Sequence, residues 1–482
     1  MTFEAHPVRE AAQTMAQIRR TLLRPGGSHA GGSPEAGGPE RGGPEGGASR
    51  PGEPSPAAAR EPRAGPAVRR AADFGALPEY ELLKIHRAAG EIAGIDNPFY
   101  RLHAGRAADT TVLDGREVVN FSSYDYLGLN GHPAIVAAAK AAIDQYGTSV
   151  SASRLTAGER QVHRDLEAAL AALHGTEDAV AFVSGHATNV SVIGGLLGAD
   201  DLIVTDALIH NSIIEGAKLS GARRILCPHG DMEALERALR LNRSRHRRAL
   251  IVAEGLYGMD GDMPPLARLV QLKRRYDAWL MIDEAHSLGV LGRTGRGVAE
   301  EQAVDPRDID IWMGTLSKTL VASGGYIAGS RQLIELLKYT SPGIVYSVGP
   351  SPAVAAAAHA ATEILRAEPQ RVGTLRRNGR AFVAAAQERG LDTGGSVGAA
   401  VVPIIVGSSP LAVLLSQRLL ARGYNAVPII FPGVAENQSR LRFFITSRHT
   451  PAQMTGALDA IAEELPALRE APSFVAALAQ GR

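Results

Sequence analysis

Short apolar runs recur through the middle of the chain, and helical patterns lie between several of them. The runs cover residues 179–183, 202–205, 224–227, 249–253, 279–282 and 310–313. Such runs, alternating with helical patterns, indicate buried strands of a mostly parallel sheet with helices on both faces. The pattern therefore predicts an α/β fold.

The pattern changes on either side of this sheet. Pro78, followed by acidic and apolar residues, predicts a helix with proline in its first turn, and Asp114-Gly115 predicts a tight hairpin turn. Near the carboxyl terminus, runs around residues 400–406 and 441–445 predict two further strands that alternate with helices. We expect three ordered parts: an N-terminal helix and hairpin segment over 73–132, a large α/β domain over 133–365 and a small α+β domain over 366–482.

Residues 1–72 have a different composition. From Arg24 to about Arg70 the chain consists mainly of Gly, Pro, Ala, Glu and Arg, which cannot bury enough apolar surface to offset chain entropy. We expect a disordered N-terminal extension. Apolar residues from Val8 to Leu22 recur at helical spacing, and two interpretations stay open: a short terminal helix without a partner, or a helix that docks on another protein.

Composition narrows the function classes. The 482 residues, 45% hydrophobic and 21% charged, suffice for two or three domains with a large core. A formal net charge of +1 gives no electrostatic reason to expect nucleic acid as a partner. No stretch is apolar over the roughly 18 residues of a membrane-spanning helix, and Met1 to Arg20 lack the apolar core of a secretory signal. One cysteine, Cys227, excludes an internal disulfide. We expect a cytoplasmic protein.

Polar residues follow the predicted strands directly. Because ligands bind beyond the carboxyl ends of parallel strands, these residues should share one rim of the sheet. Asp283 follows the run at 279–282, and Lys318 lies shortly after the run at 310–313. A lysine that binds an aldehyde and a carboxylate that keeps a pyridine nitrogen protonated are the two groups that a pyridoxal phosphate (PLP) enzyme requires. The sequence therefore predicts a PLP site.

Several longer motifs carry a resemblance to a known family. They are Phe121-Ser-Ser-Tyr-Asp-Tyr-Leu-Gly-Leu, Gly185-His-Ala-Thr-Asn, His210-Asn-Ser-Ile, Glu254-Gly-Leu-Tyr-Gly-Met-Asp-Gly-Asp, Asp283-Glu-Ala-His-Ser, Gly314-Thr-Leu-Ser-Lys and Arg440-Leu-Arg-Phe. Together, over about residues 74–470, they resemble the α-oxoamine synthases. The resemblance implies a fold-type I PLP-dependent transferase with a mostly parallel central sheet and a smaller C-terminal α+β domain.

The resemblance also implies roles for the cofactor residues. Lys318 would bind the aldehyde of PLP and then remove the α-proton of the amino acid, and Asp283 would pair with the pyridine nitrogen. His286 would contact the phenolic oxygen of the cofactor, and His210 would stack on its ring. The remaining cofactor contacts are assigned to the phosphate: Gly185 and His186 at a helix start, Thr315, and Ser347 across the interface of a homodimer.

Three residues are assigned to the substrates, and no metal ligand is assigned. Arg442 would bind the carboxylate of the amino acid, because a guanidinium fixes a carboxylate in a bidentate manner. Arg440 is the alternative, and we expect only one of the two to face the site. Tyr124 stands where relatives usually carry asparagine, and Ser153, where glycine-using relatives carry threonine, would leave room for alanine or serine.

The reaction itself follows from the resemblance alone. It implies a decarboxylative Claisen condensation of a small amino acid, alanine or serine favoured, with an acyl thioester to give an α-amino ketone. Tyr124, His186 and Gly258 depart from the oxononanoate pattern, so we favour an acyl carrier protein or long-chain acyl-CoA as donor. Alternatives are 8-amino-7-oxononanoate synthase of biotin synthesis, 2-amino-3-ketobutyrate CoA ligase, and an inactive scaffold subunit.

Overall fold

The computed structural model describes residues 73–92 and 94–470. The chain divides into two compact units, Met1–Gly94 with Pro472–Arg482, and Ile95–Ala471. The predicted extension over 1–72 lies outside the described residues. The domain boundaries predicted at 132 and 365 stay predictions.

The described part of the first unit is helical. A short 3₁₀ helix, Phe74–Ala76, precedes helix α2, Pro78–Ile92, which carries Glu79 and Glu81 in its first turn. Proline at the first position and carboxylates near the positive end of the helix dipole favour this start. The helix predicted to begin at Pro78 is confirmed.

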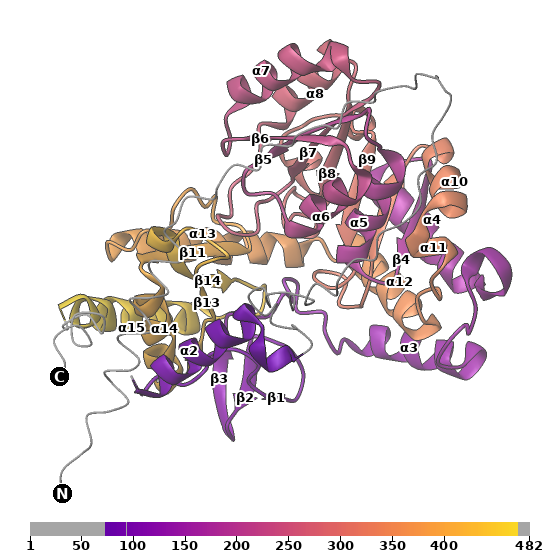
Figure 1. The fold of residues 1–482 in the computed structure, drawn as a ribbon. Helices are drawn as coiled ribbons and strands as arrows, with labels where there is room; N and C mark the ends of the chain where they lie inside the picture. Colours follow the sequence, from indigo (N-terminus) through magenta and orange to yellow (C-terminus); the bar gives the residue numbers. More distant parts are fainter. Residues whose placement is uncertain (1–72, 93, 471–482) are drawn as a thin grey trace, which may run out of the picture. The chain divides into compact units, whose positions relative to one another are not determined.

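Seven strands form the central sheet of the second unit, in the order β4-β10-β9-β8-β7-β5-β6 (Figure 1). Their bounds are β4 Asp178–Phe182, β5 Leu202–Asp206, β6 Arg223–Cys227, β7 Ala249–Glu254, β8 Trp279–Asp283, β9 Ile311–Thr315 and β10 Gly325–Gly329. Strand β10 is antiparallel to both of its neighbours, and the other paired strands are parallel. The six predicted strands are confirmed, whereas β10 was missed.

Helices cover both faces of this sheet, because alternate strand residues point to opposite faces and both sets are apolar. In β4, for example, Ala179 and Ala181 join one core cluster and Val180 and Phe182 the other. The first cluster takes residues from α4 (Gln161–His174), α7 (Met232–Asn242), α8 (Leu266–Arg275) and α12 (Pro352–Ala367). The second takes residues from α5 (Gly185–Leu196), α6 (Asn211–Ser220), α10 (Arg331–Thr340) and α11 (Pro342–Val345).

A hairpin precedes the central sheet, as predicted. Strands β2 (Thr110–Leu113) and β3 (Arg116–Asn120) pair in an antiparallel manner around Asp114 and Gly115, both with positive φ. Positive φ at both turn positions matches the twist of the flanking strands. Strand β1 (His103–Ala104) extends the hairpin on one side, and β12 (Tyr424–Asn425) on the other. Helix α3, Pro133–Tyr146, follows.

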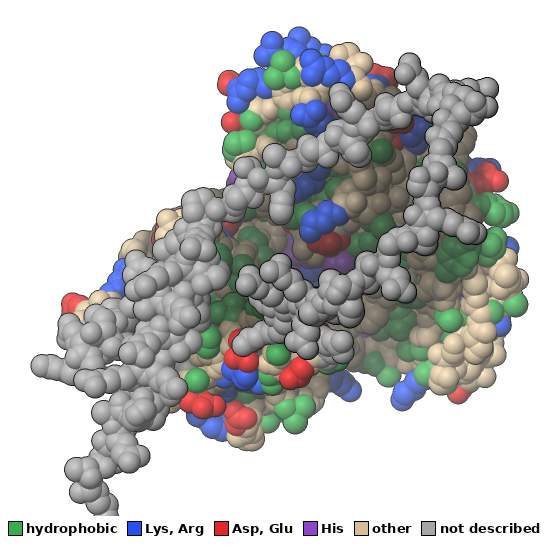
Figure 2. All heavy atoms as spheres, viewed as in Figure 1, with side chains coloured by type: hydrophobic (Ala, Val, Ile, Leu, Met, Phe, Trp, Pro, Cys, Tyr) green, Lys and Arg blue, Asp and Glu red, His purple; other side chains and the backbone are tan. Residues whose placement is uncertain are grey.

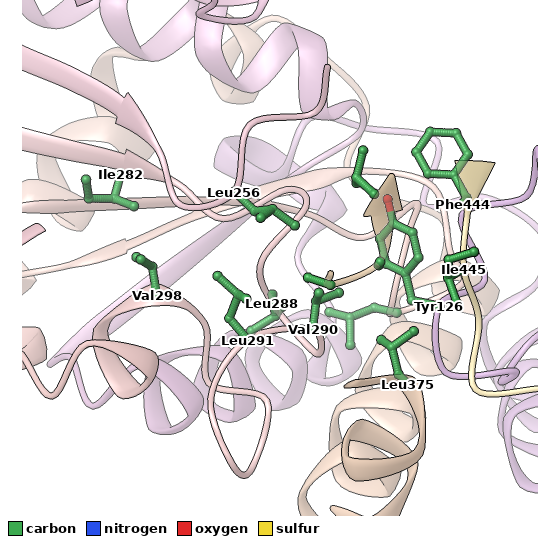
Figure 3. Packing of buried hydrophobic residues seen from close by; sticks show 14 of the residues in the cluster. Tyr126, Leu256, Ile282, Leu288, Val290, Leu291, Val298, Leu375, Phe444 and Ile445 are labelled. Atoms are coloured by element: carbon green, nitrogen blue, oxygen red, sulfur yellow. The ribbon is translucent and has the colours of Figure 1, made fainter. Parts of the chain in front are cut away.

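The carboxyl-terminal part is an α+β arrangement, as predicted. Three antiparallel strands lie in the order β11-β14-β13, with bounds Val401–Gly407, Ser439–Phe444 and Pro428–Ile429. Its helices are α13 (Gln370–Glu388), α14 (Ser409–Ala421) and α15 (Pro451–Glu470). Figure 3 shows one packed cluster running from Ile282 of β8 past Tyr126 to Phe444 and Ile445. The small sheet therefore shares its core with the end of the large sheet.

Short helical pieces complete the description. They are Arg154–Gly158, Arg243–Arg245, α9 (Val298–Glu301), Pro306–Asp308 and Glu436–Gln438. Lys and Arg side chains gather over α7 and α8 (Figure 2). Two of them, Arg268 and Arg275, form ion pairs with Glu236. Within 73–92 and 94–470, no helix combines the length and apolar character needed to cross a bilayer.

Candidate active site

A cavity of about 210 Å³ lies where β7, β8 and β9 end and α5 begins. Its lining residues are Ser184, Gly185, His186, Asn189, His210, Ser212, Glu254, Asp283, Ala285, His286, Met313, Thr315, Ser317 and Lys318. Seven of the eight residues predicted to bind the cofactor are among them. The eighth, Ser347, is partly buried and lies outside the cavity lining, and its hydroxyl donates to the carbonyl of Val348 at 3.1 Å.

Asp283 is held rigidly at the end of β8. Its side chain is 4% exposed, and its two carboxylate oxygens accept hydrogen bonds from Asn189 Nδ2 at 3.0 Å and from the backbone N–H of Ala285 at 2.9 Å. Asn189 also donates to Ser212 Oγ at 2.9 Å. A fixed, buried carboxylate at a strand end suits a protonated ring nitrogen as partner.

Lys318 follows β9 and points into the same cavity. Burial lowers the pKa of its amine, and the charges of Asp283 and Glu254 oppose that shift. Its Nζ lies 5.6 Å from the centre of the Tyr124 ring. A desolvated amine reaches its neutral, nucleophilic form at lower pH than an exposed lysine does.

His286 is buried and neutral. Desolvation lowers its pKa well below the usual value, and its Nδ1 lies 2.8 Å from the hydroxyl of Tyr126. On its other side, a Cβ at position 258 would lie only 2.5 Å from Nε2. Gly258 is therefore needed for space, and a serine there would have to displace the imidazole.

His210 is the N-cap of α6. Its Nδ1 lies 2.7 Å from Ser212 Oγ, and burial lowers its pKa. The ring of His186 approaches it edge-on at 6.3 Å between centroids. Both imidazoles line the cavity, and the predicted stacking of His210 on a cofactor ring stays a prediction.

The start of α5 fits a phosphate group. The first-turn N–H groups of a helix have no acceptor within the helix and carry a partial positive charge. Ser184 caps the helix by accepting from the N–H of Ala187 at 3.3 Å. A Cβ at Gly185 would lie 2.9 Å from Thr315 Oγ1, so only glycine leaves this cradle open. Ser317 Oγ is 2.7 Å from the same Thr315 hydroxyl.

Glu254 is a site residue that the sequence did not assign. It ends β7 directly opposite Asp283 in the sheet register and is 5% exposed. Burial, with the charge of Asp283 second, raises its pKa to about 8. One of its oxygens accepts from the N–H of Gly258 at 3.1 Å. Its place at a strand end beside Asp283 was the signal available in the sequence.

The residues assigned to the substrate lie apart from the strand ends. Arg442 of β14 donates from Nη1 to the carbonyl of Gly258 at 2.8 Å, and its buried Nε has no hydrogen-bond partner among the described residues. Its guanidinium lies 4.7 Å from the ring centre of Phe444, which also packs edge-on against Tyr124 at 4.8 Å. Tyr124 is 40% exposed.

Two further expectations concern Arg440 and Ser153. Arg440 and Arg442 contact the same loop, through the carbonyls of Met259 and Gly258. Residues two apart in a strand share a face, so strand alternation gives no reason for only one of them to face the site, and that expectation stays a prediction. Ser153 Oγ donates to the carbonyl of Val345 at 2.8 Å and is not among the cavity-lining residues. Its predicted role stays a prediction.

A family model places this chain. The model of aminotransferase class I and II matches residues 116–461, and the chain belongs to that family. The 8-amino-7-oxononanoate synthase of Geobacter sulfurreducens is 42% identical over 365 residues, which cover 75% of this chain and 92% of the relative. The 8-amino-7-oxononanoate synthase 1 of Bacillus subtilis is 38% identical over 352 residues, 73% and 89% of the two chains.

Solved structures agree. The serine palmitoyltransferase of Sphingomonas wittichii superposes with a TM-score of 0.78 at 29% identity, covering 83% of this chain and 99% of that one. A serine palmitoyltransferase solved with PLP has a TM-score of 0.78 at 27% identity. Within the family, the chain is an α-oxoamine synthase, a PLP-dependent C-acyltransferase of fold-type I. The predicted family, fold and cofactor are confirmed, and the inactive-scaffold alternative falls away.

Proposed function

We propose that this enzyme joins a small amino acid, alanine in the first place, to an acyl thioester. Carbon dioxide and the free thiol leave, and an α-amino ketone forms. The observation that supports this most directly is that Lys318 and Asp283 line one cavity together with the start of α5. When bound there, PLP supplies the electron sink for a carbanion at the α-carbon.

Lys318 takes the proton from the α-carbon in this proposal. Its burial lowers the pKa of the amine, so the neutral amine that acts as a base forms at lower pH than in an exposed lysine. Asp283, held by Asn189 and by the backbone of Ala285, would pair with the ring nitrogen of the cofactor. His286 and Tyr126 form a buried neutral pair that orients the phenolic oxygen of the cofactor.

Arg442 binds the carboxylate of the amino acid. Its Nη1 donates a hydrogen bond to the carbonyl of Gly258. The N–H of its buried Nε has no acceptor among the described residues. A buried donor without an acceptor costs free energy. A substrate carboxylate that accepts a hydrogen bond from this N–H removes that cost, which favours binding. The ring of Phe444 sets the plane of the guanidinium.

Two acyl donors are supported by different observations. The names of the 38–42% identical relatives favour the 8-amino-7-oxononanoate synthase reaction, which joins alanine to a carrier-bound acyl chain. The aromatic ring of Tyr124 beside Lys318, and His186 at the cavity, differ from the oxononanoate pattern. These two differences favour an acyl chain other than that of the oxononanoate reaction. The donor would then be a long-chain acyl-CoA or a different acyl chain bound to a carrier protein.

The experiment pairs alanine, serine and glycine with pimeloyl, succinyl and palmitoyl thioesters of CoA and of an acyl carrier protein, and detects products by mass spectrometry. We expect an α-amino ketone from alanine, and carbon dioxide in equal amount. Preference for glycine would overturn the choice of amino acid. Cleavage of 2-amino-3-ketobutyrate by CoA, without any condensation product, would instead identify the degradative ligase reaction.

The active form is proposed to be a homodimer, with Ser347 serving the site of the partner subunit. The position of Ser347 outside the cavity of its own subunit and the 86% exposed ring of Tyr346 support this. Mixing K318A with S347A should restore activity, because each mixed dimer then contains one intact site. A monomer by light scattering, or no restoration on mixing, would contradict it.

A further inference from the structure

The loop between β7 and α8, residues 255–265, lies between the candidate active site and the small sheet. At its start, Gly258 faces Glu254 and His286. Further along, Gly261 has a φ of +70°, and a Cβ there would lie only 2.1 Å from the carbonyl oxygen of Val401 in β11. The backbone therefore touches both the cavity side and the small sheet, and its position affects both.

The small sheet holds this loop through Arg440. This side chain is 4% exposed, forms an ion pair with Asp260, and donates from Nη1 to the carbonyl of Met259 at 3.2 Å. Its Nε donates to the carbonyl of Gln438 at 2.9 Å. The donors of Arg440 are thus engaged by the protein, whereas Nε of Arg442, on the same face, has no hydrogen-bond partner within the described part of the chain.

The large sheet holds the same loop through His229, which follows β6. Its two ring nitrogens lie 2.8 Å from Asp206 Oδ1 and 2.8 Å from Asp262 Oδ2. Hydrogen bonds to these two carboxylates raise its pKa to about 10, so the ring is a cation at neutral pH. A hydrogen bond from the backbone N–H of Gly230, at 2.9 Å, also holds the carboxylate of Asp206 in place. The loop is thus anchored by one ion pair on each side.

We propose that Arg440 is a positioning residue, which fixes the 255–265 loop through Asp260 so that the Gly258 carbonyl holds Arg442 in place for the carboxylate of the amino acid. The pairing also keeps Arg440 itself away from the substrate. Two buried guanidinium groups share one face, and without Asp260 the side chain of Arg440 would draw the carboxylate away from its place on Arg442. This inference rests on the proposed function in one respect only, the binding of that carboxylate by Arg442.

The test compares two ligands of the holoenzyme, alanine and alaninamide, which lacks the carboxylate. Asp260→Asn should weaken alanine about tenfold, the value of one charge-assisted hydrogen bond, and leave alaninamide unchanged, as followed by the change in cofactor absorbance. Arg440→Lys, which keeps the charge but not the planar fork, should lose less than Asp260→Asn. The matched control is Asp459→Asn on α15, which breaks the ion pair between Asp459 and Arg389 and should change neither affinity.

A second measurement does not depend on substrate. Hydrogen exchange of residues 255–265 should be faster in Asp260→Asn than in wild type and unchanged in Asp459→Asn. Equal weakening of alanine and alaninamide, or unchanged exchange of the loop, would overturn the positioning role. If wild type binds no amino acid while the exchange difference persists, the proposed function fails and the anchoring of the loop stands.

Discussion

The two halves of the site are built in different ways. The residues assigned to the cofactor lie at the ends of adjacent strands and in the first turn of α5, so the register of one sheet fixes them. Tyr124 and Arg442, two of the residues assigned to the substrate, come from separate segments, the chain before α3 and strand β14. Both pack on Phe444, and Arg442 also contacts the 255–265 loop. Changes in the first half should stop the chemistry, and changes in the second should alter substrate affinity.

The largest effect is expected for Lys318→Ala. This change removes the group assigned to bind the aldehyde and move the α-proton, so turnover should fall by about 10³-fold or more. Borohydride followed by peptide mass spectrometry should label wild type at residue 318 and leave the variant unlabelled. Substantial turnover without label would show that the cofactor half lacks the role assigned to it.

Glu254→Gln should change the pH dependence of stability. The pKa of Glu254 is raised from 4.5 to about 8 in the folded chain, so its contribution is fully present below pH 4.5 and is lost as the pH rises through 8. Relative to the variant, wild type should lose on the order of 5 kcal/mol over that range. Urea unfolding of both proteins at several pH values measures this. Parallel curves would contradict a protonated acid beside Asp283.

Arg442→Lys tests the substrate half. A lysine keeps the charge but not the bidentate fork, so the KM for alanine should rise roughly 10- to 100-fold, with a much smaller change in kcat. Steady-state kinetics separate the two constants, and cofactor content serves as the control. A fall in kcat alone would assign Arg442 to the chemistry instead.

Gly258→Ala tests the boundary between the halves and should have the smallest effect. The added Cβ would lie 2.5 Å from His286 Nε2, so the imidazole must shift away from Tyr126. We expect a loss of about 1 kcal/mol in the free energy of unfolding and a shifted cofactor absorbance maximum. Unchanged stability and spectrum would mean that His286 is not fixed as described.

Most of the large sheet could be predicted from the sequence, because each buried parallel strand is a short apolar run. Strand β10 was missed because Gly325 and Gly329 bound a run of only three residues between them, and its antiparallel pairing with β4 and β9 leaves no local signal. The cofactor residues were predictable for the same reason as the strands, since they follow them directly along the chain.

The residues that were missed act through contacts distant in sequence. Asn189 reaches Asp283 from a helix, and Tyr126 reaches His286 from the chain before α3; neither distance can be read from spacing. For Arg440 and Arg442 strand alternation was no guide, because residues two apart share a face. Their different surroundings, Asp260 for one and a free Nε for the other, depend on the folded loop.

The placement of β10 has a consequence for biosynthesis. Strand β4 pairs only with β10 within the central sheet, and β10 leaves the ribosome about 140 residues later. At roughly 5–20 residues per second, the nascent chain carries an unpaired apolar strand for on the order of ten seconds. Such an edge is a template for wrong pairing, so cellular yield of this enzyme should depend on how quickly translation reaches residue 329 and on the chaperones that meet the chain before then.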